Sequence, residues 1–202
     1  MELTALFSLA ILVISIVIHE VAHGIAALSQ GDSTAKYAGR LTLNPISHID
    51  PVGSIVVPLI FALLPGSLMF GWAKPVPINP YNFRNKRWGE AIVAFAGPFS
   101  NICIAVLAGL ALRFFGAAIP DATAQILIIT ALTNLVLAIF NLVPVPPLDG
   151  SKILFSFLPQ SMAHLRANLE KYGFFVTLFF IFFLWEYFTP VIFYIFYGLT
   201  GL

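Results

Sequence analysis

His19-Glu20-Val21-Ala22-His23 stands inside an otherwise uncharged N-terminal stretch of this 202-residue chain. Residues 3–18 and 24–31 carry no charged side chain. In a helix, residues four positions apart share one face, so the two imidazoles can reach a single zinc ion. Glu20 then lies beside the metal, where its carboxylate can take a proton from a water that the metal activates. Such polar groups are costly in a membrane-length apolar segment, which indicates that they serve a function.

The composition indicates an integral membrane protein. The chain is 59% hydrophobic and 9% charged, whereas soluble domains carry about 25% charged residues. No internal repeat or low-complexity segment is evident, so we expect residues 1–202 to form a single membrane-embedded domain. The expected fold class is an all-α polytopic membrane protein, a helical bundle. A net charge of +1 gives no indication of a basic surface that would bind nucleic acid.

Uncharged runs mark the expected membrane segments, which are residues 3–29, 51–73, 91–112, 122–148 and 172–202, the last interrupted by Glu186. Nine of the ten Lys and Arg residues fall in the stretches 30–50, 71–90 and 149–171. The positive-inside rule assigns all three stretches to the cytoplasm. Residues 51–73 contain Pro58 and Pro65-Gly66, which break helices, so we expect a re-entrant segment rather than a full span. The last run fits one tilted helix, or two short pieces broken near Thr189-Pro190.

Residues 34–43 alternate in character, with Tyr37, Leu41 and Leu43 on one face and Gly39 between them. This alternation predicts a small membrane-associated β element after the first helix. Two interpretations are open, a simple surface loop and an edge strand that holds a substrate extended by strand addition. In the second, Tyr37, Gly39 and Leu41 would bind substrate.

A catalytic zinc ordinarily has three protein ligands and a water, so the two histidines leave one ligand to find. The candidates are the remaining membrane-edge residues His48, Asp50, Asp121, Asp149, His164 and Glu186. Asp149 stands out because it follows a proline-rich run and precedes Gly150, which permits a tight turn. If residues 51–73 are re-entrant, segments 3–29 and 122–148 run in the same direction. Their C-terminal ends then bring Asp149 to the depth of the histidines.

Four motifs together resemble the site-2 protease family of intramembrane zinc metalloproteases, in a compact form without PDZ or CBS modules. They are HEVAH at 19–23, GWAKPVPIN at 71–79, AGPFSN at 96–101 and NLVPVPPLDG at 141–150. The similarity covers about residues 15–155. The resemblance implies one zinc per chain, ligated by His19, His23 and Asp149, with Glu20 as general base and Asn141 near the scissile carbonyl. It also implies a re-entrant β element over residues 34–46.

The two asparagines in these motifs each have two interpretations. The Asn141 amide could donate to the developing oxyanion, or it could cap backbone groups that Pro144 and Pro146 leave free. Asn101 could contribute to substrate binding and brace the site. Alternatively, it could form a hydrogen bond between helices, which is worth about 0.6 kcal/mol on average.

The expected activity is hydrolysis of peptide bonds in membrane-spanning protein or peptide substrates. The expected partners are that substrate and the lipid bilayer, and a homo-oligomer is compatible with the sequence. The compact form and the resemblance favour a prokaryotic plasma membrane, with the active site towards the cytoplasm. A zinc or proton transport protein could use the same His, Glu and Asp cluster, but it would more naturally show internal repeats. A non-catalytic scaffold would not require the intact set, and a prenyl-protein protease would share HExxH alone.

Overall fold

The computed structural model describes residues 2–57, 59–60 and 72–202, and within them every regular element is a helix, with no strand. The long helices are α1 (Glu2–Ser29), α4 (Gly89–Phe115), α5 (Asp121–Leu142), α7 (Ala163–Phe179) and α8 (Thr189–Thr200). Two short α-helices, α2 (Thr34–Tyr37) and α6 (Asp149–Phe157), stand at connections. Single turns of 3-10 helix occupy Pro45–His48, Pro80–Asn82, Gly116–Ala118 and Gln160–Met162. The all-helical bundle expected from the sequence is therefore confirmed for these residues.

Four helical segments of the described chain are long and apolar enough to cross a membrane. They are Thr4–Ser29, Gly89–Ala118, Asp121–Leu142 and Ala163–Thr200. A span requires about 20 residues, which each of them exceeds. Large apolar side chains such as Leu107, Phe175 and Phe183 are more than half exposed, as lipid-facing residues are. The chain is a multi-pass integral membrane protein.

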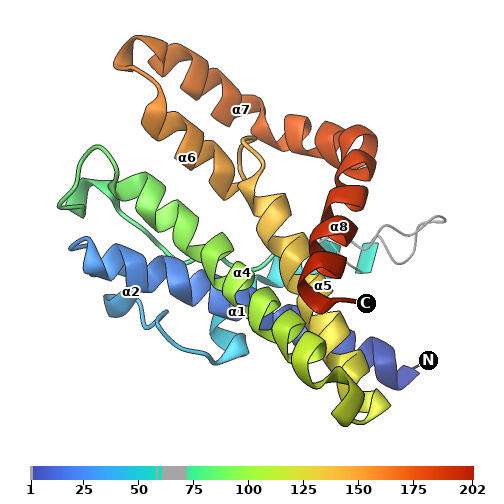
Figure 1. Ribbon diagram of the computed structural model, residues 1–202. Helices are drawn as coiled ribbons and strands as arrows, with labels where there is room; N and C mark the ends of the chain where they lie inside the picture. The colour runs from blue at the N-terminus through green and yellow to red at the C-terminus, as the bar shows by residue number, and fades with distance from the viewer. Residues whose placement is uncertain (1, 58, 61–71) are drawn as a thin grey trace.

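Helices α1, α4 and α5 pack side by side, with α4 antiparallel to the other two (Figure 1). Small residues at the contact, Ala105 and Ala108 on α4 and Ala131 on α5, let the backbones approach closely. Ile192 and Phe196 of α8 complete this cluster. Because α1 and α5 run in the same general direction, their C-terminal ends lie at the same end of the bundle.

The β element predicted for residues 34–43 is wrong. Thr34–Tyr37 forms one turn of helix, and Gly39 follows it with a φ of +65°. The backbone N–H groups of Tyr37, Ala38, Gly39 and Arg40 all donate to carbonyls between Ser33 and Lys36. The side chain of Asp32 also accepts from the Thr34 N–H. Since these backbone donors are satisfied locally, the segment does not offer them to a neighbouring strand, and alternation of side chains alone misled the prediction.

The predicted re-entrant segment 51–73 lies partly outside the described residues, which exclude 58 and 61–71. Its first part, Pro51–Val56, is a π-helical turn whose N-terminal N–H groups are capped by Asp50. The N–H of Trp72 donates to the carbonyl of Gly53 at 3.0 Å. The two described ends therefore meet, whereas a single crossing of the hydrocarbon would separate them by about 30 Å.

The C-terminal run forms two pieces rather than one straight helix. Between α7 and α8 the chain passes through a π-helix, Phe180–Leu184, and a 3-10 turn, Trp185–Phe188. Pro190 lies in the first turn of α8, where a missing N–H is tolerated. The chain bends sharply at this junction (Figure 1), so the break precedes the predicted Thr189-Pro190 by a few residues.

Candidate metal centre

Helix α1 presents His19 and His23 on one face, as their four-residue spacing predicts. Both side chains are buried, each with 6% of its surface exposed. Their Nε2 atoms lie 3.0 Å apart, and the two rings meet edge to face. The motif therefore directs two nitrogen atoms to one point in the interior of the bundle.

Asp149 brings a carboxylate oxygen to the same point. It is the first residue of α6, after the irregular segment 143–148 that ends α5. Its Oδ2 lies 3.2 Å from Nε2 of His19 and 3.1 Å from Nε2 of His23. A Cβ added at Gly150 would come within 2.2 Å of the Leu142 carbonyl oxygen. Glycine thus lets the chain fold back on the end of α5 and direct Asp149 inward.

The donor set fits a zinc ion. Zinc bonds of about 2.0–2.1 Å in a tetrahedral arrangement separate ligand atoms by about 3.3–3.4 Å, and the three observed separations are a few tenths of an ångström shorter. The Nδ1 of His23 donates to the carbonyl of Val93 at 2.7 Å, so its Nε2 carries a lone pair. The Nδ1 of His19 lies 2.6 Å from Oδ1 of Asn101. With both Nδ1 hydrogens directed away from the centre, two imidazole lone pairs and a carboxylate converge, and this is a donor set that zinc takes in proteins.

Helix α4 closes over the two histidines at Gly97. A Cβ at this position would lie 2.4 Å from Nε2 of His23 and 2.6 Å from Nε2 of His19. No side chain larger than hydrogen fits between α4 and the converging nitrogen atoms. Gly97 is therefore more than a packing residue, because it leaves the space that a metal would occupy.

Glu20 follows His19 on α1 and is held by the chain that follows the predicted re-entrant segment. The N–H of Val76 donates to its Oε2 at 2.8 Å. Residues 73–79 have no regular secondary structure, and Pro75 and Pro77 keep this stretch extended. One carboxylate oxygen of Glu20 is thus fixed by the backbone, while its Oε1 has no hydrogen bond within the described residues and is available for proton transfer.

Two buried charged residues tie the extended stretch to the end of α1. Arg40 donates to the carbonyls of Lys74 and Pro75, at 2.6 and 3.4 Å. Asp32 is fully buried and accepts from the N–H of Asn79 at 2.7 Å and from the Asn82 amide at 2.8 Å. Burial raises the pKa of Asp32, but these bonds and those from Thr34 outweigh it, so the pKa lies below its usual range.

A small cavity reaches His23. It has a volume of about 220 Å³, and its lining includes His23, Val76, Ile78, Glu90 and Lys152. A water in the liquid occupies about 30 Å³, so water can enter. The Nζ of Lys152 lies 3.4 Å from Oδ1 of Asp149, which places a positive charge beside the carboxylate.

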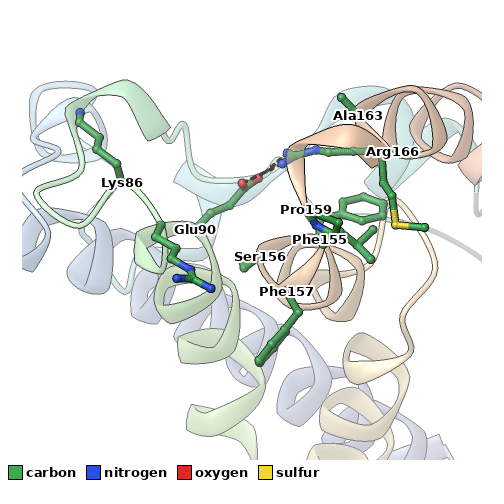
Figure 2. A pocket seen from close by; sticks show the side chains of 11 residues that line it. Lys86, Glu90, Phe155, Ser156, Phe157, Pro159, Ala163 and Arg166 are labelled. Carbon is green, nitrogen blue, oxygen red and sulfur yellow. Dashed lines mark hydrogen bonds and ion pairs between the residues drawn. The ribbon is translucent and has the colours of Figure 1, made fainter.

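Figure 2 shows a second, larger cavity, of about 700 Å³, between the start of α4 and helices α6 and α7. Glu90 lines both cavities. Its carboxylate forms an ion pair with Arg166 of α7, with two contacts of 2.8 and 3.2 Å (Figure 2). This pair stands where the two cavities adjoin.

The other predicted site residues lie in different surroundings. Asn101 is fully buried, and its side chain contacts His19, one of the candidate metal ligands. The Asn141 amide donates to the Leu137 carbonyl one turn back at 2.9 Å. Tyr37 is 86% exposed, and Leu41 packs against Gly24 of α1. A role of Tyr37, Gly39 and Leu41 in substrate binding stays a prediction, without the strand on which it was based.

Sequence reasoning missed several residues of the site. Asn134 and Ser15 are buried beside Asn101. Asn134 could have been found because it is a strongly polar side chain in the uncharged run 122–148. The Val76 contact gives no such signal, since it uses a backbone N–H and joins positions 56 residues apart.

Comparisons with known proteins agree with this geometry. A protein-family model described as "Peptidase family M50" matches residues 111–184. The "Putative zinc metalloprotease YwhC" of Bacillus subtilis is 40% identical over 174 residues, which cover 83% of this chain and 76% of the relative. The "Putative zinc metalloprotease Rip2" of Mycolicibacterium smegmatis is 30% identical over 164 residues, 81% of this chain and 61% of the relative. Its namesake in Mycobacterium tuberculosis is 28% identical over 158 residues, with 78% and 57% covered. The chain spans less than two thirds of both Rip2 proteins, and no solved structure matches it.

Proposed function

This chain belongs to peptidase family M50, the site-2 protease family, and is a zinc metalloprotease of the membrane; on that premise we propose that His19, His23 and Asp149 hold its zinc and that Glu20 is its general base. The observation that carries this assignment is the convergence of the three ligand atoms. All three lie within 4.8 Å of one another, and all three residues are buried. Asp149 lies 126 and 130 residues along the chain from the two histidines, so local chain geometry does not explain why it meets them.

When bound by these residues, zinc supplies Lewis acidity, which lowers the pKa of water towards about 7 and polarises a peptide carbonyl. The carboxylate of Glu20 takes the proton of the attacking water at its free oxygen and returns it to the leaving amine. The Val76 N–H holds the other oxygen, so the base keeps its orientation while the proton moves. Burial of the ligands excludes bulk water and strengthens these interactions.

Asn141 is our candidate donor to the oxyanion that develops on the substrate carbonyl. It lies in the last turn of α5, just before the segment that carries Asp149. Turning its amide away from the Leu137 carbonyl releases an N–H for the substrate. A donor that acts on an oxyanion is worth about 2.7–4 kcal/mol of barrier.

The substrates are membrane proteins, and the bilayer is the enzyme's environment. A bound segment must be unwound, because the peptide bonds of a helix are shielded by its own hydrogen bonds and side chains. We place its approach in the larger cavity, since Glu90 lines both that cavity and the one that reaches His23. All the proposed ligands and the base come from one chain, so the proposed zinc site needs no residue from a second copy.

The proposed orientation has the active site towards the cytoplasm of a prokaryotic plasma membrane, with residues 1–202 acting as one domain. Lys152 lies at the site, and Lys74 lies in the extended stretch beside it. This supports a cytoplasmic location by the positive-inside rule, and the relatives named above are bacterial. None of their names denotes a transporter, so transport is not favoured.

Cleavage of a transmembrane peptide in reconstituted vesicles tests the assignment. The wild-type enzyme should cut a panel of peptides with helix-breaking residues, and mass spectrometry should place the cut inside the apolar segment. Glu20→Gln should keep its zinc and lose at least about 100-fold in rate. Asp121→Asn, exposed at the start of α5 and therefore at the opposite end of that helix from the site, serves as the control and should retain activity. Cleavage by Glu20→Gln at the wild-type rate would exclude Glu20 as the base.

A further inference from the structure

Three polar side chains meet in the apolar interior behind the candidate metal centre. They are Ser15 of α1, Asn101 of α4 and Asn134 of α5, with exposed fractions of 3%, 0% and 0%. These are the three helices that pack side by side in Figure 1. Burying two amides at this depth is unfavourable unless every polar group has a partner.

A backbone carbonyl determines the direction of the hydrogen bonds in this cluster. The Nδ2 of Asn134 donates to the carbonyl of Thr130 at 2.9 Å and to the hydroxyl of Ser15 at 2.9 Å. A carbonyl only accepts, so the NH₂ group of Asn134 must face Thr130 and Ser15. Both of its N–H bonds are then used, and its Oδ1 must face the other way.

That orientation fixes the next amide. The Oδ1 of Asn134 accepts from Nδ2 of Asn101 at 2.8 Å. The Nδ2 of Asn101 also lies 3.4 Å from the carbonyl of Ser15, a second pure acceptor. The Oδ1 of Asn101 is therefore turned to His19, where it can only accept.

The proton of His19 follows from the same logic. Its Nδ1 lies 2.6 Å from Oδ1 of Asn101, so Nδ1 carries the hydrogen and Nε2 keeps the lone pair that faces His23 and Asp149. His23 has the same tautomer, with hydrogen on Nδ1, because its Nδ1 donates directly to the Val93 carbonyl. One ligand is oriented by a backbone carbonyl, and the other by two amides in series.

The structure assigns Asn134 and Ser15 as positioning residues that act through Asn101 to hold His19 in the tautomer that ligates zinc. This assignment rests on the proposed metal site. Neither residue touches the site itself. A hydrogen bond from the second nitrogen of a ligating histidine orients the ring and raises its basicity, and loss of such a partner costs about 10–100-fold in metal affinity.

A role limited to joining helices would involve the same contacts, but it would not require a particular direction of the hydrogen bonds. Asn134→Leu distinguishes the two because it leaves the Asn101 amide free to reverse and turn its NH₂ towards His19. Adding Asn101→Asp to this variant restores an acceptor for His19 that cannot be reversed, since a carboxylate has oxygen on both sides. A helix-joining role gives no reason for a second polar change to repair the first.

The experiment measures zinc affinity by chelator competition in the detergent-purified full chain, with helical content and elution volume checked for each variant. Asn134→Leu should weaken zinc binding about 10–100-fold, and Asn134→Leu with Asn101→Asp should recover most of that loss. Thr133→Val, the adjacent position on α5 and outside the cluster, should bind zinc as the wild type does. Wild-type affinity in Asn134→Leu, or no recovery in the double variant, would overturn the assignment. A wild type that binds no zinc would instead refute the metal site on which it rests.

Discussion

The backbone N–H of Val76 lies 2.8 Å from Oε2 of Glu20 and donates a hydrogen bond to it. The two residues are 56 positions apart, and the chain between them includes the predicted re-entrant segment. The contact orients the candidate base with a backbone N–H, which only a substitution to proline removes. It also gives a reason for Pro75 and Pro77, which keep the stretch around Val76 extended beside α1.

Val76→Pro should slow hydrolysis by up to about 100-fold with little change in zinc content. The substitution removes the donor N–H from a stretch that is already extended, so Glu20 loses its fixed orientation and misplacement of the order of 1 Å has this effect. The measurements are kcat on a transmembrane peptide and zinc per chain.

Ala73→Pro is the matched control for that variant. Ala73 lies in the same stretch but lines neither cavity, and its N–H has no hydrogen-bond partner in the described part of the chain, so its removal leaves Glu20 in place. We expect kcat to remain close to that of the wild type. Equal losses in the two variants would mean that proline acts on the stretch as a whole and that the Val76 bond has no special part.

Gly97→Ala should abolish most zinc binding although it adds one methyl group. That methyl would lie within 2.6 Å of both Nε2 atoms, in the space that the metal requires. Gly116→Ala, at the end of the same helix with nothing within 4 Å of the added carbon, should bind zinc normally. Zinc analysis of the purified variants checks this, and full zinc content in Gly97→Ala would place the metal elsewhere.

Asp32→Asn should lower thermal stability in detergent at pH 7 by about 1–3 kcal/mol, because the buried donors of Asn79 and Asn82 lose a charged acceptor. The folded pKa of Asp32 lies below its usual value. Its stabilisation is therefore present above the unfolded pKa of about 3.9 and is lost as the pH falls through the folded pKa.

The melting temperatures of wild type and Asp32→Asn should thus converge as the pH falls below about 4. Thermal unfolding followed by circular dichroism at several pH values measures the difference. A difference that stays constant down to the lowest pH would show that the charge of Asp32 is not what stabilises the extended stretch.

The membrane helices and the meeting of His19, His23 and Asp149 could be predicted because they depend on long-range composition and strict spacing. Apolar length identifies α1, α4 and α5, and helical periodicity places His19 and His23 on one face. Asp149 was found because proline and glycine around it indicate irregular backbone at the end of a helix. These signals are strong in a membrane, where few other arrangements satisfy the backbone.

Contacts made by backbone groups and by single polar residues could not be predicted in this way. The alternation at residues 34–43 suggested a strand, but the buried carboxylate of Asp32 and local N–H bonds favour a helical turn. The Glu20 contact depends on where a loop returns, which no spacing encodes. Asn134 was visible as a polar residue in an apolar run, but its partners become evident only when α1, α4 and α5 are packed together.

Zinc per chain in the purified wild type, beside Asp149→Ala, tests the central claim most directly. It needs no substrate, and it separates a site built from α1 and α6 from one built from the histidines alone. We predict about one zinc in the wild type, as a site of three protein ligands and a water requires, and a sharp loss in the variant. Unchanged zinc in Asp149→Ala, or a wild type purified without chelators that holds almost none, would contradict the account.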